Sequence, residues 1–334
     1  MDDQQDPVAD AAEGGADLYD IATWEERTSL DGVAVALYRL LSVLSRVGVV
    51  LVGAVLLLGV VGLGTLTNPE VGLLTVLSAA PALGLAGYVW YADEVTDEPP
   101  ALLVGTFLLG VVTANFAAVL NGIAGPQFRR LAGGVGTVVF FFLVVGPVEE
   151  SVKLLAVRLW AYTKSGFDAV IDGAVYGAMA GLGFATIENA LYISRQLPES
   201  QAIGLGLIGA GGGITALRAL AGPGHVIYSA FAGYYLGLAK FNPGSRGPIV
   251  VKGIVIAALI HATYNSVVGP ASVLLAGVLG TGGFLSYLLF VALYDGVFGL
   301  LLVRKLKRYR DAYHSARDDG RVESAREGDV PDVE

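Results

Sequence analysis

The chain has 334 residues, of which 54% are hydrophobic and 15% are charged, and its mean hydropathy is +0.64. These values exclude an ordinary soluble domain and are typical of an all-α, polytopic protein of the cell membrane. The net charge of −9 disfavours a nucleic-acid partner, and the absence of cysteine excludes disulfides, thiolate metal ligands and a cysteine nucleophile. The lipid bilayer is therefore the first partner that the composition predicts.

Residues 1–45 read as an acidic, polar N-terminal tail. Nine acidic side chains and no basic one fall within residues 1–26, and such a composition is typical of solvated, disordered segments. A surplus of acids with few lysines also resembles the proteins of halophilic archaea. Leu30 to Arg46 could form an amphipathic helix at the membrane interface. The acidic start predicts no cleavable signal peptide.

Residues 46–303 read as one integral membrane domain, followed by a charged cytoplasmic C-terminal tail over 304–334. A span needs about 20 apolar residues. The segment 202–220 is the weakest, because it is rich in glycine and carries Arg218, so we expect eight or nine crossings. Basic loops place one side as cytoplasmic, but the orientation of the N-terminus stays open. The expected spans are about 47–66, 71–92, 101–124, 132–160, 167–193, 202–220, 223–240, 251–268 and 271–303.

The stretch 132–163 is too long for one straight crossing. As a helix it would run about 48 Å, against a hydrocarbon core of about 30 Å. Gly146-Pro147 lies in its middle, where proline breaks or kinks a helix. A broken membrane helix is tolerated where it is buried in protein or lines a cavity. We therefore expect "GPVEESVKLL" to begin a helix at a break, with its glutamates near the positive end of the helix dipole.

Polar side chains interrupt the apolar segments at four places. Intramembrane ionisable groups are functional-site hypotheses by default. Each place also has a plain structural explanation: a self-paired ion cluster, an interhelical hydrogen bond, a helix cap or a polar contact between helices. Four such costly placements in one chain favour a common function. The places are Glu149/Glu150/Lys153, Glu188/Asn189, His225 after a Gly-Pro-Gly stretch, and His261/Asn265.

Other polar residues receive the structural explanation. Asp168 and Asp172 lie at a helix start, where acids suit the helix dipole. Asp295, in the middle of a span, is unexplained and is a weaker functional candidate. Interhelical hydrogen bonds are expected from Asn115, Asn121 and Arg218.

The distributed set suits hydrolysis. A glutamate can take a proton from water, and imidazoles can bind a divalent metal or hydrogen-bond an oxyanion. No Ser-His-Asp set emerges, and the HExxH zinc signature and the YD/GxGD aspartyl-protease signature are absent. Function must therefore rest on residues from several helices.

The motifs resemble those of the PrsW family of intramembrane proteases, relatives of the CAAX prenyl endopeptidase and bacteriocin-immunity (CPBP) superfamily. "EESVK" matches EExxK, "FATIEN" matches FxxxEN, "GPGH" supplies an isolated membrane histidine, and "HATYN" matches HxxxN. Each motif alone is weak, but four in the family's order on separate apolar helices are specific. The resemblance covers about residues 100–270.

The resemblance implies a role for each of these residues. Glu149 would be the base that activates water, with Glu150 as its partner, and Lys153 and Asn189 would support the site. Glu188 would replace the histidine of CAAX-type relatives, while His225, His261 and Asn265 would complete the site. Glu188, His225 and His261 would suit zinc, but a metal-free mechanism with His261 and Asn265 as oxyanion donors fits the same residues. The implied partner is a membrane-anchored protein substrate, which bacterial members cleave in regulated proteolysis.

Two other readings stay open at this point. A proton- or ion-coupled transporter would also use broken helices and intramembrane Glu, His and Asn, although no internal repeat is visible. An inactive membrane scaffold is the third. The expected topology also places Glu188 near the inner end of its span, away from Glu149, His225 and His261. Their convergence is therefore the decisive question.

Overall fold

A computed structural model describes residues 17–38, 69–93, 98–196 and 205–318, together with the single positions Asp6 and Val8. The expected first span, 47–66, and most of the terminal tails lie outside these residues. The described part contains no named strand, and Tyr19 and Thr23 form an isolated bridge. The all-α prediction is confirmed. A short helix, Ser29–Tyr38, covers part of the expected interfacial helix.

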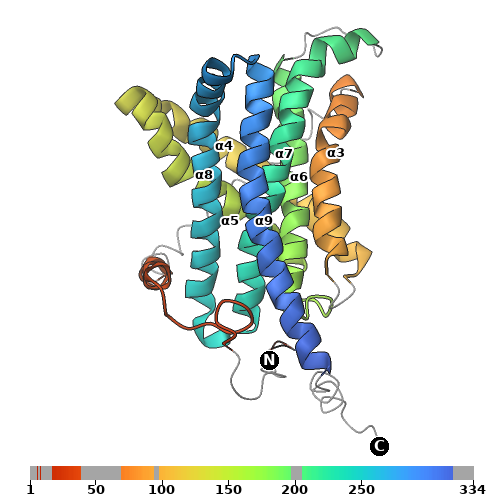
Figure 1. Cartoon of the computed structure of the whole chain (residues 1–334), viewed down its shortest axis with the longest axis vertical. Coiled ribbons are helices and arrows are strands. Elements are labelled where there is room, and N and C mark those ends of the chain that lie inside the picture. Colours follow the sequence, from red (N-terminus) through yellow and green to blue (C-terminus); the bar gives the residue numbers. More distant parts are fainter. Residues whose placement is uncertain are drawn as a thin grey trace, which may run out of the picture.

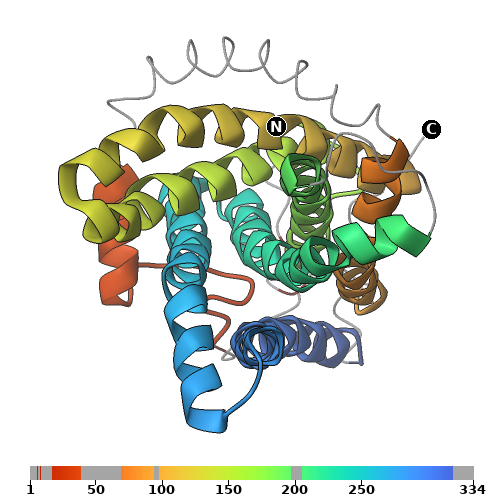
Figure 2. The ribbon, with the colours of Figure 1, turned by 90° about the horizontal axis from the view of Figure 1, so that it is seen from above.

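The long helices form a bundle around α6 and α7 (Figure 1). Seen from above, much of α6, α7 and α9 runs close to the viewing direction, whereas the end of α8 runs across the view and α4 and α5 lie across one side of the bundle (Figure 2). The described elements are α3 (Pro69–Tyr91), α4 (Pro100–Phe140), η2 (Phe141–Val145), α5 (Gly146–Trp160), α6 (Val170–Gln196), α7 (Leu205–Lys240), η3 (Pro243–Ser245), α8 (Arg246–Leu279) and α9 (Gly283–Asp318).

Five helices of the described part are long and apolar enough to cross a membrane, so the expectation of a polytopic membrane protein is confirmed. The continuous stretch Pro100–Trp160 counts as one of them, and α7 is not among the five. Large apolar side chains stay exposed on the outer helices, as expected for lipid contact, and α6 is almost fully covered by its neighbours. The expected number of eight or nine crossings stays a prediction.

The expected discontinuity at Gly146-Pro147 takes the form of a π-helical turn. The backbone stays helical through η2, and the Gly146 N–H bonds to the Phe141 carbonyl, five residues back. This pattern accommodates Pro147, whose ring would otherwise crowd the preceding turn. A sharper change of direction falls at Ala132 (φ −148°) and Gly133 (φ +53°), within α4. The chain thus turns between the two segments expected at 101–124 and 132–160.

Two expected span boundaries are wrong. The Gly-Pro-Gly stretch does not separate two spans, because α7 runs continuously from Leu205 to Lys240 with Pro223 inside it. The end of α8 lies at Leu279, where Gly280 adopts the left-handed conformation (φ +63°), and not near Pro270. Proline is tolerated within both helices because its neighbours in the bundle compensate locally. Beyond them, α9 continues as a helix past residue 304, into the expected tail.

Glycines set two close helix contacts that matter for the polar residues. A Cβ at Gly146 would lie 2.6 Å from the Ala258 carbonyl oxygen, so α5 lies directly against α8. A Cβ at Gly181 would lie 2.4 Å from the His225 carbonyl oxygen, so α6 lies against α7. These approaches are impossible for larger residues and bring the polar positions of four helices together.

Part of the acidic N-terminal segment is docked and is not a solvated tail. We call residues 17–31 the N-terminal clasp. Lys252 Nζ lies 2.9 Å from Asp20 Oδ1 and 2.7 Å from Asp31 Oδ1, and Lys305 Nζ lies 2.9 Å from Asp20 Oδ2. Tyr234 donates a hydrogen bond of 2.8 Å to the Ile21 carbonyl. Lysines of α8 and α9 therefore hold the acidic segment, which composition alone assigned to solvent.

Candidate active site

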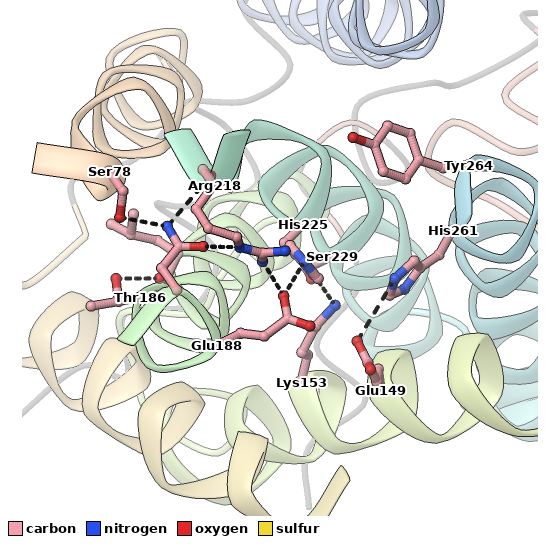
Figure 3. A network of polar contacts seen from close by, with 12 residues as sticks. Ser78, Glu149, Lys153, Thr186, Glu188, Arg218, His225, Ser229, His261 and Tyr264 are labelled. Carbon is pink, nitrogen blue, oxygen red and sulfur yellow. Dashed lines mark hydrogen bonds and ion pairs between the residues drawn. The ribbon is translucent and has the colours of Figure 1, made fainter. Parts of the chain in front are cut away.

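The polar residues that interrupt the apolar helices converge on one region (Figure 3). They come from helices that are distant in sequence, and the depth conflict expected for Glu188 does not exist. The continuous α7 removes it, because the segment 202–220 does not cross separately from 223–240. Helix α5 contributes Glu149, Glu150 and Lys153; α6 contributes Glu188 and Asn189; α7 contributes Arg218 and His225; and α8 contributes His261 and Asn265.

Glu149 is the carboxylate that lacks a cationic partner. Its Oε1 accepts a 2.9 Å hydrogen bond from Asn121 Nδ2 of α4. Its Oε2 is buried and has no hydrogen-bond partner among the described residues, and it lies 3.7 Å from His261 Nε2. The side chain is 4% exposed. A buried, unsatisfied carboxylate oxygen is costly and needs an explanation in a native structure.

Glu150 orients His261. Its Oε1 lies 2.9 Å from His261 Nδ1 and accepts 2.7 Å from Lys153 Nζ, while its Oε2 accepts 3.4 Å from Ser229 Oγ. Because an ionised carboxylate only accepts, Nδ1 carries the proton and Nε2 keeps its lone pair. That lone pair faces Glu149 Oε2. A carboxylate on one ring nitrogen is the arrangement that prepares the other nitrogen as a metal ligand.

Lys153 links the two halves of the site. Its ammonium also lies 3.0 Å from His225 Nδ1 and 4.3 Å above the centre of the Phe184 ring. A charged lysine only donates, so Nδ1 of His225 accepts and its Nε2–H donates to Glu188 Oε2, 2.9 Å away. Lys153 thus neutralises Glu150 and fixes the tautomer of His225.

Glu188 is held by an arginine that sequence reasoning assigned only to helix contacts. Arg218 places NH2 2.5 Å from Glu188 Oε2 and donates through Nε to Asn189 Oδ1 at 2.8 Å. Asn189 in turn donates to Ser78 Oγ of α3 at 2.9 Å. Figure 3 shows the resulting chain of contacts from Ser78 to His225. Both residues of the "EN" pair therefore have partners on neighbouring helices.

A cavity of about 480 Å³ adjoins these groups. Glu149, Glu188, His225, His261 and Asn265 line it, so five of the expected site residues share one space. Glu150, Lys153 and Asn189 do not line the cavity, but each contacts a residue that does. The cavity is also lined by two arginines, Arg129 and Arg195. Both are exposed on the protein surface, so the cavity opens to the outside.

The possible metal donors that the structure brings close together in the active site differ from the expected set. Donor atoms of Glu149, His225 and His261 all lie within 4.8 Å of one another, and all three side chains are buried. The expected set had Glu188 in place of Glu149. Glu188 is engaged by Arg218 and His225, whereas Glu149 Oε2 is unshared. Glu149 therefore fits a cation better than Glu188 does.

The interhelical hydrogen bonds expected from Asn121 and Arg218 are present, but their partners in the site were not foreseen, and Ser229 was not singled out at all. Asn115 bonds within its own helix, to the Val111 carbonyl. Asn121 binds Glu149, Arg218 binds Glu188, and Ser229 binds Glu150. Ser229 follows His225 by four residues on α7, so the i, i+4 spacing was a signal available for it. Arg218 lies in a membrane helix near a functional glutamate, and the cost of a buried arginine was a signal for a carboxylate partner.

The chain is similar in sequence to known proteases. A family model described as "PrsW family intramembrane metalloprotease" matches residues 98–296. Protease PrsW of Bacillus subtilis is 32% identical over 58% of this chain and 81% of its own length. Protease PrsW of Geobacillus kaustophilus is 29% identical over 56% of this chain and 75% of its own length, and that of Clostridioides difficile is 29% identical over 54% and 74%. No solved structure matches the chain significantly.

The matched residues run from the start of α4 into α9 and include all the residues that line the site. The family model covers more than half of the chain, and the Bacillus subtilis relative is matched over most of its length. Together with the apolar helices, these matches establish that the chain belongs to the PrsW family of intramembrane metalloproteases and is a multi-pass peptidase of the cell membrane.

Proposed function

We propose that this chain hydrolyses a peptide bond of a membrane-anchored protein in the cavity between α4, α5, α6, α7 and α8, with Glu149 and His261 at the reacting centre. The observation that carries the proposal is the pair formed by Glu149 Oε2 and His261 Nε2. The two atoms are 3.7 Å apart, and no described residue forms a hydrogen bond with Oε2. They face the cavity as two acceptors, which suits a water molecule or a cation between them.

Two versions of the chemistry use these same atoms. In the first, Glu149 Oε2 takes a proton from a water molecule that attacks the scissile carbonyl. In the second, Glu149, His225 and His261 hold a divalent cation such as Zn²⁺, which when bound polarises the carbonyl and activates water. Glu150 positions His261 in both versions, whereas Glu188, itself held by Arg218, positions His225 in the first version.

The charges of the site favour the second version. Lys153 and Arg218 form ion pairs with only two of the three carboxylates, so one negative charge has no ion-pair partner among the described residues while the histidines are neutral. Glu149 carries that charge, since Lys153 and Arg218 bind the other two carboxylates. Asn265 makes no side-chain hydrogen bond among the described residues and is free to donate to the substrate carbonyl. His225 joins a cation only if its Nε2 exchanges Glu188 for the metal.

The test compares cells that express the wild-type chain with cells that express Glu149→Gln. New protein termini in membrane-anchored proteins are identified by mass spectrometry of the membrane fraction. Wild type should generate cleavage products that Glu149→Gln and His261→Ala do not. Glu70→Gln, the same chemical change at the start of α3, is the matched control and should behave as wild type. Equal products from all four chains would reject the proposal.

Metal content separates the two versions. The purified wild-type chain should contain close to one divalent transition-metal ion per molecule, and His261→Ala should lose it. Chelation should abolish cleavage, and Zn²⁺ should restore it. A metal-free wild-type preparation that still cleaves would reject the second version and leave the first.

A further inference from the structure

A second group of carboxylates, two of them buried and one half-buried, lies away from the active site, where α3 ends and where α4 and α6 begin. Asp93 follows α3, Glu98 precedes α4, and Asp172 is in the first turn of α6. Oxygen atoms of these three residues all lie within 4.8 Å of one another. Glu98 is 4% exposed and Asp172 is 0% exposed. We call these three residues the corner cluster.

Helix capping explains one member of the corner cluster. Asp172 Oδ2 accepts the backbone N–H groups of Asp168 at 2.7 Å and of Ala169 at 2.9 Å, as expected for an acid at a helix start. Those bonds fix the position of the carboxylate. They give no reason for two further carboxylates to be placed beside it.

Glu98 supplies an independent sign of a missing ligand. Its Oε1 is buried and has no hydrogen-bond partner among the described residues. The nearby Lys240 donates to the Phe167 carbonyl, and Arg310 donates to the Ala92 carbonyl at 3.3 Å. Within the described part of the chain, no lysine or arginine forms an ion pair with Glu98. Like charges this close and this buried need a counter-charge or a proton.

We propose that Asp93, Glu98 and Asp172 form a second cation site, which binds Ca²⁺ and joins the end of α3 to the starts of α4 and α6. The donors are carboxylate oxygens without histidine or cysteine, which selects hard cations over Zn²⁺. Ca²⁺ binds oxygens at about 2.4 Å in a flexible, irregular geometry, which suits carboxylates that come from three separate segments of the chain. Mg²⁺ requires distances of about 2.1 Å and a smaller, more regular cage.

The experiment measures Ca²⁺ binding and thermal unfolding of the full chain in detergent. Wild type should bind one Ca²⁺ saturably and unfold at a higher temperature when Ca²⁺ is present. Glu98→Gln should weaken binding at least tenfold and remove the temperature shift. Asp93→Asn, at the most exposed member, provides a second variant in case Glu98→Gln does not fold, and it should weaken binding in the same direction. Glu149→Gln should keep Ca²⁺ binding, because the active site is separate.

Several outcomes would overturn the corner cluster as a Ca²⁺ site. Wild type that binds no Ca²⁺ is one, and Glu98→Gln that binds as well as wild type is another. A wild type without Ca²⁺ affinity, together with a Glu98→Gln variant of higher unfolding temperature, would show that a proton compensates the cluster instead. Equal affinity for Mg²⁺ and Ca²⁺ would reject the assigned ion. These results do not depend on peptidase activity.

Discussion

The N-terminal clasp and the active site both bury acidic side chains, but they compensate them differently. In the clasp, Asp20 and Asp31 face two lysines, Lys252 and Lys305, at 2.7 to 2.9 Å. In the active site, three carboxylates face two permanent cations, and Glu149 is left with one unshared oxygen. Matched charges hold a segment in place, whereas the mismatched charge leaves a group that can react or bind.

Glu149→Gln is the strongest test of this contrast. The amide keeps the shape of the side chain but loses the charge and the free acceptor that water or a cation needs. The rate of cleavage should fall by about 10²-fold or more, because the variant enzyme lacks a general base or a metal ligand. In the metal-free chain the unfolding temperature should not fall, since the variant removes an uncompensated buried charge. A stable variant that retains wild-type cleavage would contradict the assignment of the reacting carboxylate.

Lys252→Met tests the other side of the comparison. It leaves the Asp31 carboxylate buried without its main counter-charge, so the free energy of unfolding should fall by about 3–5 kcal/mol. Unfolding of the detergent-solubilised chain in denaturant measures this free energy. The exposed Lys164 gives a matched control, because Lys164→Met should change stability by less than about 0.5 kcal/mol. If both variants unfold alike, the clasp contributes no stability through its charges.

Arg218→Lys weakens the compensation inside the site without removing the charge. Lysine lacks the planar fork through which Arg218 donates to Asn189 from Nε and to Glu188 from Nη2, so His225 should lose part of its positioning. We expect cleavage to fall by about 10- to 100-fold, as for other residues that orient a ligand. Cleavage is compared with that of Arg130→Lys, a change at an exposed position of α4. Unchanged cleavage in Arg218→Lys would show that Glu188 needs only a positive neighbour.

Acid should release the clasp at a low pH. Burial alone would raise the pKa of Asp31, but hydrogen bonds from Lys252, Tyr19 and Thr28 hold this pKa below its usual value. The pKa of Asp20 is also lowered, against its burial, by Lys305 and Lys252. A depressed folded pKa contributes stability above the unfolded value of about 3.9, and this stability is lost as the pH falls through the folded pKa. The clasp should therefore stay closed from pH 8 to pH 5 and open only below about pH 4.

Trp24 reports this opening, because it is partly buried and its backbone N–H donates to Asn242 Oδ1. With Trp90 and Trp160 replaced by Phe, its fluorescence should shift to longer wavelength only in the acidic range. A transition centred near pH 6 would point to a histidine instead of the two aspartates.

The residue types of the site were predictable, but their partners were not. The spacing of Lys153 allows a contact with either Glu149 or Glu150, and the structure has the one with Glu150. The i, i+4 spacing of His261 and Asn265 puts both on one helix face, and both line the cavity. Asn121 and Arg218 contact the site only because of how α4 and α7 are rotated and packed, which no local spacing reveals. The same holds for the choice of Glu149 over Glu188 as the better metal donor.

The fold class was predictable from the sequence. The predicted span boundaries were wrong where a proline was taken to end a helix. Pro223 and Pro270 lie inside continuous helices, because neighbouring helices compensate for the missing N–H. The acidic clasp was misread for a related reason. Composition describes a segment in water, whereas Lys252 and Lys305 are supplied by distant parts of the chain.

The π-turn before Gly146 has a consequence for insertions and deletions. A π-turn holds one residue more than an α-helical turn, and this wider turn accommodates the ring of Pro147. Removal of Val144 would close the turn, so the Pro147 ring would crowd the carbonyl one turn back and tilt α5 relative to α8. Such a deletion should abolish cleavage, whereas Leu143→Val, a change of side chain at an exposed position of the turn, should not. The loss of a single codon outside every motif would therefore inactivate the enzyme. The number of residues in this turn matters for the active site as much as its glutamates do.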